Sequence, residues 1–232
     1  MGDTMRLEVR NLTKTYAGGW GAHEVCFSVP PGQIVALGGP NGSGKSTVLK
    51  CIAGLVRFDG AIMLDGNLLD TPSSRAGIGY LPQVVGMPDH ATIGEMIQLF
   101  ADLRGADPAS IPLPEDFVRD PATEIGTLSG GQRHRVALAI ALLGSPSLVL
   151  LDEPIANLDE AGRATFWEVL RRLRDEDGVT AIVSSPAPGE LRGVVDRGIG
   201  MEDGRTGDDE LYAPGLHVAP SLDLADGTEA SA

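Results

Sequence analysis

Basic side chains are scarce in this sequence. Its 232 residues include 18 Lys and Arg against 32 Asp and Glu, which gives a net charge of −14, and the lysines are Lys14, Lys45 and Lys50. A surface with this charge repels the phosphates of nucleic acids and of anionic lipids. The composition therefore disfavours a nucleic-acid-binding protein. It fits a salt-adapted cytoplasm, where ions screen the self-repulsion, and equally well the codon usage of a high-GC genome.

Long hydrophobic runs and cysteines are also few. The longest uninterrupted apolar stretch, residues 136–143, is far short of the roughly 18 residues that indicate a membrane span. Residues 1–5 show no basic region followed by an apolar one, so we expect no signal peptide and a soluble, cytoplasmic protein. Cys26 and Cys51 lie in apolar strand and helix patterns, which predict buried thiols, not a disulfide or a metal site.

Strand and helix patterns alternate along the chain, which is typical of an α/β core. The sequence predicts strands at residues 6–12, 25–29, 34–37, 61–64, 77–81, 148–151 and 179–184 and near Ile199. It predicts helices at residues 46–55 and 160–175, and two more that open at Thr92 and at Ser129, each with a capping box. Residues 105–120 are rich in Pro and Asp, so a loop is expected there.

A glycine-rich segment follows the apolar run at residues 34–37. It fits the pattern G-x-x-x-x-G-K-[ST], whose backbone N–H groups converge on phosphate oxygens, whose lysine reaches the terminal phosphates and whose hydroxyl ligates Mg²⁺. A helix that starts near Ser46 adds the positive end of its dipole. A plain turn would explain the glycines, but not Gly-Lys-Ser in fixed register after a strand. The predicted phosphate-binding residues are Gly39, Pro40, Asn41, Gly42, Ser43, Gly44, Lys45, Ser46 and Thr47.

Two acidic residues end the apolar run at residues 148–151. A buried strand of this kind places Asp152 beside the phosphate loop, where its carboxylate can hold Mg²⁺ directly or through water. Glu153 then points at the space beyond the terminal phosphate. Its expected role is that of general base or water-orienting group for hydrolysis. The alternative is that both acids merely cap the next helix.

Residues 128–132, Leu-Ser-Gly-Gly-Gln, resemble the signature motif of ABC-transporter nucleotide-binding domains. Ser129 and Gln132 alone explain a capping box, but Gly130 and Gly131 are poor helix formers that suit the approach of an anion. The resemblance extends over residues 6–205. It implies an α/β fold of the P-loop NTPase class, with a RecA-like core, an antiparallel β subdomain and a helical subdomain inserted at about residues 84–145. Residues 206–232 are expected to form an acidic, partly disordered tail.

The resemblance also implies ATP and Mg²⁺ as cofactors and assigns further roles. Tyr16 matches the aromatic residue that stacks on adenine, and Gln83 matches a glutamine that contacts Mg²⁺ and the attacking water. Residues 156–159 match a loop that crosses to a partner subunit. The implied metal ligands are Ser46, Gln83 and Asp152, and the implied catalytic residues are Glu153 and Gln83.

In this family two domains pair head to tail. Each ATP then lies between the phosphate loop of one domain and the signature motif of the other, here Ser129, Gly130, Gly131 and Gln132. The resemblance therefore implies a homodimer or heterodimer that binds a separate permease at the cytoplasmic face of the membrane, with no role for nucleic acid.

One position departs from the family pattern. A histidine normally follows the strand that here ends in Ser184-Ser185, but this sequence has Pro186. Proline has no side-chain donor, so the usual contact to the γ-phosphate is missing. We expect hydrolysis to be slow and ATP binding to be retained.

The type of ABC protein is the least constrained feature. Residues 92–105 resemble the equivalent helix of drug, haem and copper-processing exporter ATPases, and residues 83–128 form a short segment for an importer. The sequence therefore favours an exporter subunit. The alternatives are an importer ATPase, a soluble ATPase of an assembly or maturation system, and a regulatory subunit that binds ATP but barely hydrolyses it. In this family the permease chooses the substrate, so the sequence does not identify it.

Overall fold

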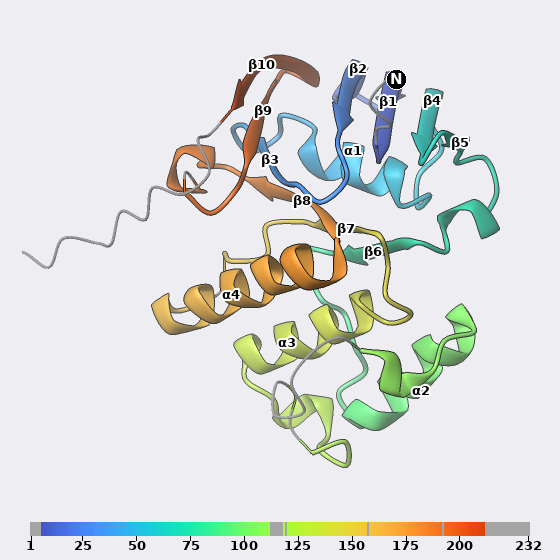
Figure 1. The fold of residues 1–232 in the computed structure, drawn as a ribbon, viewed down its shortest axis with the longest axis vertical. Helices are drawn as coiled ribbons and strands as arrows, with labels where there is room; N and C mark the ends of the chain where they lie inside the picture. Colours follow the sequence, from blue (N-terminus) through green and yellow to red (C-terminus); the bar gives the residue numbers. More distant parts are fainter. Residues whose placement is uncertain (1–5, 112–117, 119, 157, 192, 212–232) are drawn as a thin grey trace, which may run out of the picture.

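The computed structural model describes residues 6–111, 118, 120–156, 158–191 and 193–211. Within them the chain forms two β-sheets, with helices on both sides of the larger sheet (Figure 1). No helix in this part of the chain has the length and apolar character needed to cross a bilayer.

The larger sheet has six strands in the order β10-β9-β3-β8-β7-β6. Its strands are β3 (Ile34–Gly38), β6 (Ile78–Leu81), β7 (Leu148–Leu151), β8 (Thr180–Ser185), β9 (Arg197–Glu202) and β10 (Arg205–Leu211). All neighbours are parallel except β9 and β10. Strands β3, β7 and β8 are buried along their whole length, as near-continuous apolar runs in a covered parallel sheet must be.

The parallel arrangement explains the position of the candidate site. The phosphate loop follows β3, Gln83 follows β6, Asp152 and Glu153 follow β7, and Pro186 follows β8. Because parallel strands end at the same edge of the sheet, these segments meet there, which is where α/β proteins bind ligands.

The smaller sheet is antiparallel, with the strand order β2-β1-β4-β5. Its strands are β1 (Leu7–Thr15), β2 (Gly21–Val29), β4 (Asp59–Leu64) and β5 (Asn67–Leu68). The turn between β1 and β2 carries Tyr16 and Trp20, and the Tyr16 N–H donates to the Trp20 carbonyl at 2.9 Å. This sheet is the antiparallel β subdomain that the sequence predicts.

The described part of the chain also contains four α-helices: α1 (Lys45–Ile52), α2 (Ile93–Arg104), α3 (Gly130–Ala141) and α4 (Glu160–Asp177). Short 3-10 helices occur at Ser73–Arg75, Pro108–Ser110, Ile125–Thr127 and Pro188–Leu191. Helices α2 and α3 share an apolar cluster that includes Ile93, Ile125 and Val136, separate from the two clusters around the large sheet. They lie at the end of the molecule away from the smaller sheet (Figure 1). Ala137 and Leu138 of α3 pack in a cluster of the large sheet instead, so α3 joins the two parts, and the inserted helical subdomain stays a prediction.

Both predicted capping boxes are present. The Thr92 Oγ1 accepts the Glu95 N–H at 3.2 Å while the Glu95 carboxylate accepts the Thr92 N–H at 2.8 Å. Ser129 and Gln132 make the same reciprocal pair at 3.2 and 2.9 Å. Each box satisfies two backbone donors that have no partner within the helix.

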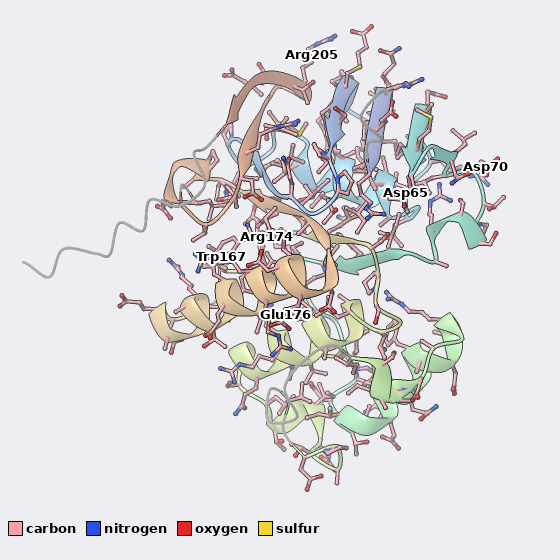
Figure 2. All side chains as sticks on the ribbon, in the orientation of Figure 1. Asp65, Asp70, Trp167, Arg174, Glu176 and Arg205 are labelled. Carbon is pink, nitrogen blue, oxygen red and sulfur yellow. The ribbon has the colours of Figure 1, made fainter. Side chains whose placement is uncertain are left out.

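The boundary expected at residue 205 is wrong for residues 206–211, which belong to β10. Arg205 and Thr206 pair with Glu202 and Met201 of β9, and the Arg205 guanidinium contacts the Glu24 carboxylate of β2 at 2.6 Å. Arg205 is labelled at the end of β10 nearest β2 in Figure 2. This acidic strand is ordered by pairing with β9, which its composition does not reveal. Residues 212–232 lie outside the described residues.

Two smaller expectations are also corrected. Helix α1 ends at Ile52, not at residue 55, because the chain turns at Gly54 with φ at 76°. Cys51 is buried as predicted, and burial raises the pKa of its thiol to about 11. Cys26 is exposed, because it lies on the β2 face opposite the buried Val25, and its Sγ lies 3.2 Å from the Asn11 side-chain oxygen.

Candidate functional site

The phosphate loop depends on glycine at two positions. Gly39 and Gly44 have φ of 151° and 98°, in the region that favours glycine. A Cβ on Gly39 would lie 2.0 Å from the Met201 carbonyl oxygen, and one on Gly44 would lie 2.4 Å from that of Gly21. The loop is therefore held against β9 and the start of β2 by contacts that no other residue allows.

Lys45 begins α1 and reaches back over the loop. Its Nζ donates to the carbonyl oxygens of Gly39 at 2.7 Å and Pro40 at 3.0 Å, and the residue is only 4% exposed. Burial lowers the pKa of Lys45, and the charges of Glu153 and Asp152 oppose that shift. The ammonium is thus held at the loop, where phosphate oxygens can replace the carbonyls as acceptors.

Asp152 and Ser46 bring suitable Mg²⁺ ligands together. The Ser46 Oγ donates to the Asp152 Oδ1 at 2.9 Å, and Asp152 is 1% exposed. The Tyr80 hydroxyl lies 3.5 Å from the other Asp152 carboxylate oxygen, and burial raises the pKa of this phenol. Carboxylate and hydroxyl oxygens are the hard ligands that Mg²⁺ prefers, and Mg²⁺ commonly binds through one or two carboxylates together with water and substrate phosphates. These residues therefore fit the metal.

Glu153 and Gln83 face each other across the end of the sheet. The Gln83 Nε2 donates to the Glu153 Oε2 at 2.9 Å. Both side chains line a cavity of about 210 Å³ together with Asn41, Gly42, Gly44, Lys45, Ser46, Thr47 and Trp20. One cavity thus holds the Lys45 ammonium, a hydroxyl that could ligate Mg²⁺ and a carboxylate that can accept a proton from water.

Trp20 lies at the candidate site, although no motif of the sequence predicts it there. It is 59% exposed and lines the same cavity as the phosphate loop. Its ring stacks on Tyr16, with centroids 4.2 Å apart and planes at 17°, and the Lys14 ammonium lies 5.2 Å from the Tyr16 ring centroid. Tyr16 is expected to stack on adenine, but here one of its faces is already covered by Trp20. An aromatic residue in the turn Gly18-Gly19-Trp20-Gly21 was the available signal.

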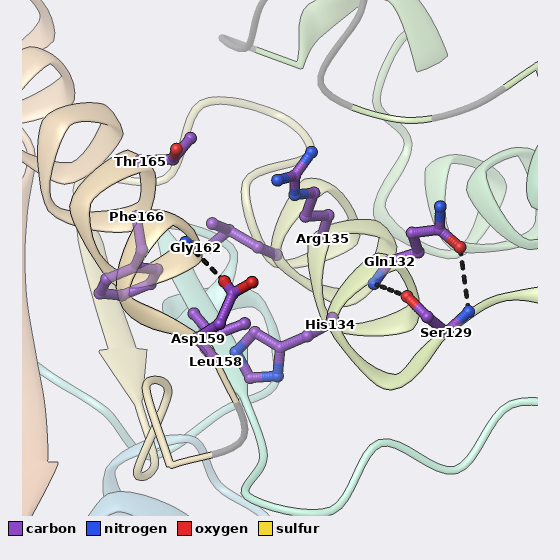
Figure 3. A pocket seen from close by; sticks show the side chains of 11 residues that line it. Ser129, Gln132, His134, Arg135, Leu158, Asp159, Gly162, Thr165 and Phe166 are labelled. Carbon is purple, nitrogen blue, oxygen red and sulfur yellow. Dashed lines mark hydrogen bonds between the residues drawn. The ribbon is translucent and has the colours of Figure 1, made fainter.

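The signature motif lies in a different cavity. Ser129 and Gln132 open α3, and they line a cavity of about 350 Å³ that is closed on its other side by the start of α4 (Figure 3). There Asp159 caps α4 by accepting the Gly162 N–H at 2.8 Å. None of the residues that the structure describes lines both this cavity and the one at the phosphate loop.

The two signature glycines are not required by the packing of this chain. A Cβ on Gly130 would meet no atom within 4 Å, and one on Gly131 would make only an ordinary 3.8 Å contact with Leu158. Among the described residues, the Gly130 position therefore faces open space, at a helix N-terminus whose cavity is separate from that of the phosphate loop. Such a surface is free to receive an anion brought by another molecule.

Comparison with known proteins identifies the family. The family model described as ABC transporter matches residues 22–156, which include the phosphate loop, Gln83, the signature motif, Asp152 and Glu153. The chain belongs to the ABC transporter family. Its fold is that of an ABC-type ATP-binding domain.

Individual relatives agree with this assignment. The chain is 34% identical to "Fe(3+) ions import ATP-binding protein FbpC 3" of Rhodococcus jostii, over 99% of this chain and 70% of that protein. It is 36% identical to "Sulfate/thiosulfate import ATP-binding protein CysA" of Mycobacterium tuberculosis, over 87% of this chain and 60% of that protein. Among solved structures, a dimeric post-hydrolysis state of the ATP-binding cassette MJ0796 bound to ADP and Pi matches with a TM-score of 0.76 and 28% identity, over 89% of this chain and 99% of that one.

Pro186 stands at the edge of the ATP-binding domain's phosphate loop. The preceding carbonyl, that of Ser185, accepts the Gly39 N–H at 3.2 Å, and Pro188 packs against Gly38, where an added Cβ would lie 2.4 Å from its ring. The segment after β8 is thus close to the loop, and Pro186 itself is exposed. No donor is present on its side chain.

The histidines in the described residues do not replace the missing group. His134 lies on α3 and lines the signature-motif cavity. Burial lowers its pKa, and the Pro154 carbonyl opposes that shift. His23 lies in β2 near Gly204, and His90 precedes α2. His217 lies outside the described residues.

We predict that Pro186→His raises kcat for ATP hydrolysis by about tenfold or more, because an added donor at the developing phosphate charge recovers part of the roughly 10²–10³-fold that such a donor contributes. The affinity for ATP should change little. Phosphate release under saturating MgATP measures the effect, and Pro186→Ala is the control that removes the ring without adding a donor. Equal rates for the wild type and both variants would show that the missing histidine is compensated.

Proposed function

We propose that this chain is the ATP-hydrolysing subunit of an ABC importer and that it energises a separate permease at the cytoplasmic face of the membrane. The observation that carries the proposal is the single cavity in which Lys45, Ser46, Gln83 and Glu153 meet at the end of the parallel sheet. The cavity brings together the Lys45 ammonium, the Ser46 hydroxyl, which is hydrogen-bonded to Asp152, and the Glu153 carboxylate, which is hydrogen-bonded to Gln83.

Each of these residues has a chemical role in the proposal. Residues 39–47, which include Lys45, bind the phosphates of ATP. Ser46, Asp152 and Gln83 would hold Mg²⁺, which would neutralise phosphate charge. Glu153 accepts the proton of the attacking water, and Gln83 orients the Glu153 carboxylate through the 2.9 Å hydrogen bond between them. Tyr16 and Trp20 provide the aromatic surface for the base.

The direction of transport follows the relatives and replaces the exporter expected from the sequence. The FbpC and CysA proteins are described as import ATP-binding proteins, and the alignment with FbpC 3 covers 99% of this chain. The resemblance of residues 92–105 to exporter helices concerns a short amphipathic segment, whose pattern is set mainly by the cluster it packs in. Importer is therefore the better-supported direction.

A second copy of an ATP-binding domain completes the site in this proposal. The signature motif and the phosphate loop of one chain line separate cavities, and the related cassette MJ0796 is described as a dimer bound to ADP and Pi. We infer that Ser129, Gly130, Gly131 and Gln132 face the ATP held by the partner domain. The partner is a second copy or a related domain.

This chain has a surface that is suitable for docking a segment of the permease. A groove of about 520 Å³ runs between the large sheet and the helical subdomain, with Leu55, Val84, Met87, Phe100 and Arg104 in its lining. Leu55 and Val84 are 63% and 80% exposed, which is unusual for apolar side chains that share one groove. Gln83 lines both this groove and the phosphate-loop cavity. A permease segment in the groove would therefore contact the residue next to Glu153.

We predict that Val84→Asp weakens binding of the chain to its permease by at least about tenfold, because a charge placed in an apolar contact must be desolvated. Basal ATPase activity of the isolated subunit should remain. Co-purification of the two subunits in detergent, with quantification of the bound fraction, measures the effect.

Leu99→Asp is the matched control for this experiment. Leu99 is also exposed, at 50%, and lies on α2, but it does not line the groove. Equal binding by both variants would contradict the proposed docking surface. A chain that binds no membrane protein encoded beside it would instead favour the soluble assembly ATPase.

A further inference from the structure

Ser184 occupies a position that links the two acidic residues of the site. Its Oγ donates to the Asp152 Oδ1 at 2.7 Å and accepts the backbone N–H of Glu153 at 2.9 Å. The side chain is almost completely buried, with 1% exposure. One hydroxyl therefore contacts the metal-binding carboxylate and the backbone of the catalytic glutamate at the same time.

The place of Ser184 in the sheet explains how it reaches both groups. Strands β7 and β8 are parallel, and Leu151 pairs with Val183. Ser184 is thus the next residue along β8, level with the start of the Asp152-Glu153 segment. The preceding residues 181–183 are Ala, Ile and Val, all fully buried, so a polar side chain here is not part of the apolar pattern of the strand.

Only a hydroxyl group satisfies both contacts through a single atom. It offers one O–H donor to a carboxylate and lone pairs to an N–H group. An alanine or valine at this position would leave the Glu153 N–H without this acceptor and would remove one of the two hydroxyl donors on the Asp152 Oδ1, the other being Ser46. Unsatisfied buried polar groups are costly, so the local geometry would shift.

The backbone of Glu153 shows why this contact matters. Glu153 has φ at 48°, in the left-handed region that non-glycine residues rarely adopt. Such a conformation persists only where the surrounding structure fixes it. The bond from the Glu153 N–H to Ser184 is one such restraint, and the bond from Gln83 to the Glu153 carboxylate is another.

We propose that Ser184 is a positioning residue for ATP hydrolysis, which fixes the Asp152 carboxylate for the metal and the Glu153 backbone for the base through one shared hydroxyl. This inference rests on the proposed function of the same site. Ser184 itself touches neither nucleotide nor water in this role. It acts through Asp152 and Glu153, so its loss should impair Mg²⁺ use and turnover more than nucleotide binding.

The test compares Ser184→Ala with Ser184→Thr, which keeps the hydroxyl. We expect Ser184→Ala to lower kcat about ten- to hundredfold and to raise the half-saturating Mg²⁺ concentration about tenfold, the size expected for losing a hydrogen bond to a charged group. Binding of a fluorescent ATP analogue in EDTA should be unchanged, because the phosphate loop is intact. Ser184→Thr should restore both parameters to within about threefold of the wild type, since its hydroxyl retains both hydrogen-bonding functions.

Thr180→Val provides the matched structural control. Thr180 lies at the other end of β8, is fully buried, and its Oγ1 accepts the Gly32 N–H at 2.9 Å. This variant also loses a buried hydroxyl acceptor in the same strand, so it reports the effect of destabilisation alone. Thermal unfolding of all variants, measured without nucleotide, shows whether each is folded.

The outcomes separate this inference from the proposed function. If Ser184→Ala matches Thr180→Val in kcat and in Mg²⁺ dependence, Ser184 is only a structural residue and the inference is wrong. If Ser184→Ala fails to fold, the Ser184→Thr variant decides. A folded Ser184→Thr protein whose kcat and Mg²⁺ dependence match those of Thr180→Val supports the positioning role of Ser184. A folded Ser184→Thr protein with an impaired Mg²⁺ response contradicts that role. A wild-type protein that neither binds nor hydrolyses ATP would overturn the proposed function itself.

Discussion

Lys45→Ala is expected to lower the affinity for ATP by at least about a hundredfold, since charge-assisted hydrogen bonds contribute about 1.5–3 kcal/mol each and the ammonium offers several donors to the phosphates. The fold should be retained. Among the described residues, the Lys45 Nζ donates hydrogen bonds to the loop carbonyls of Gly39 and Pro40, and burial already disfavours its charge, as the lowered pKa shows. Removing the ammonium therefore removes a ligand contact without opening the apolar core.

Titration with a fluorescent ATP analogue measures this effect. Tryptophan emission gives a second readout, because Trp20 lines the cavity whereas Trp167 is 7% exposed and packs edge-on against Phe166. Lys50→Ala is the control, since Lys50 lies on the same helix but lines the groove and not the phosphate-loop cavity. Undiminished affinity in a folded Lys45→Ala protein would mean that this loop is not the nucleotide site.

Glu153→Gln is expected to reduce ATP hydrolysis by about 10²–10⁴-fold, the range that a positioned general base contributes. The amide has the same shape, and its oxygen can still accept the Gln83 Nε2 hydrogen bond that holds the carboxylate at 2.9 Å in the wild type. It cannot take the proton of the attacking water. ATP should therefore stay intact, and under the proposed two-domain arrangement the dimer should accumulate.

Light scattering with and without MgATP measures the dimer, and phosphate release measures the rate. Glu168→Gln is the control, because Glu168 is an exposed carboxylate on α4 that does not line the cavity. A Glu153→Gln protein that hydrolyses ATP at the wild-type rate would exclude this glutamate as the base. One that stays monomeric at high concentration, even with the permease present, would count against the two-domain site.

Short-range patterns predicted most of the fold and of the candidate site. The Gly39–Thr47 loop, the capping boxes of α2 and α3 and the buried strands β3 and β7 each follow from residues close together in the chain. Their physics is local: helix ends need acceptors and donors, and a covered parallel strand must be apolar. The family resemblance added the expectation that the phosphate loop and the signature motif, which lie far apart in the chain, act on the same ATP. No local pattern supplies that expectation.

Two expectations are wrong because the position of a segment in its sheet overrides the local sequence pattern. Residues 206–211 have the acidic composition of a tail, but pairing with β9 makes them a strand. Cys26 lies in an apolar segment, but its place in β2 turns it to the exposed face. Composition cannot show which edge of a sheet is open or which face is covered.

The sequence by itself determined that this protein has a phosphate loop, an acidic strand end and a signature motif, because each is a fixed order of residue types within a few positions. The tertiary structure decided which groups touch. Ser46 meets Asp152 across 106 residues of chain and Gln83 meets Glu153 across 70, because parallel strands end at one edge of the sheet. The same packing stacks Trp20 on Tyr16 and sets Ser184 between the two acids, contacts that depend on strand order and register and not on any motif.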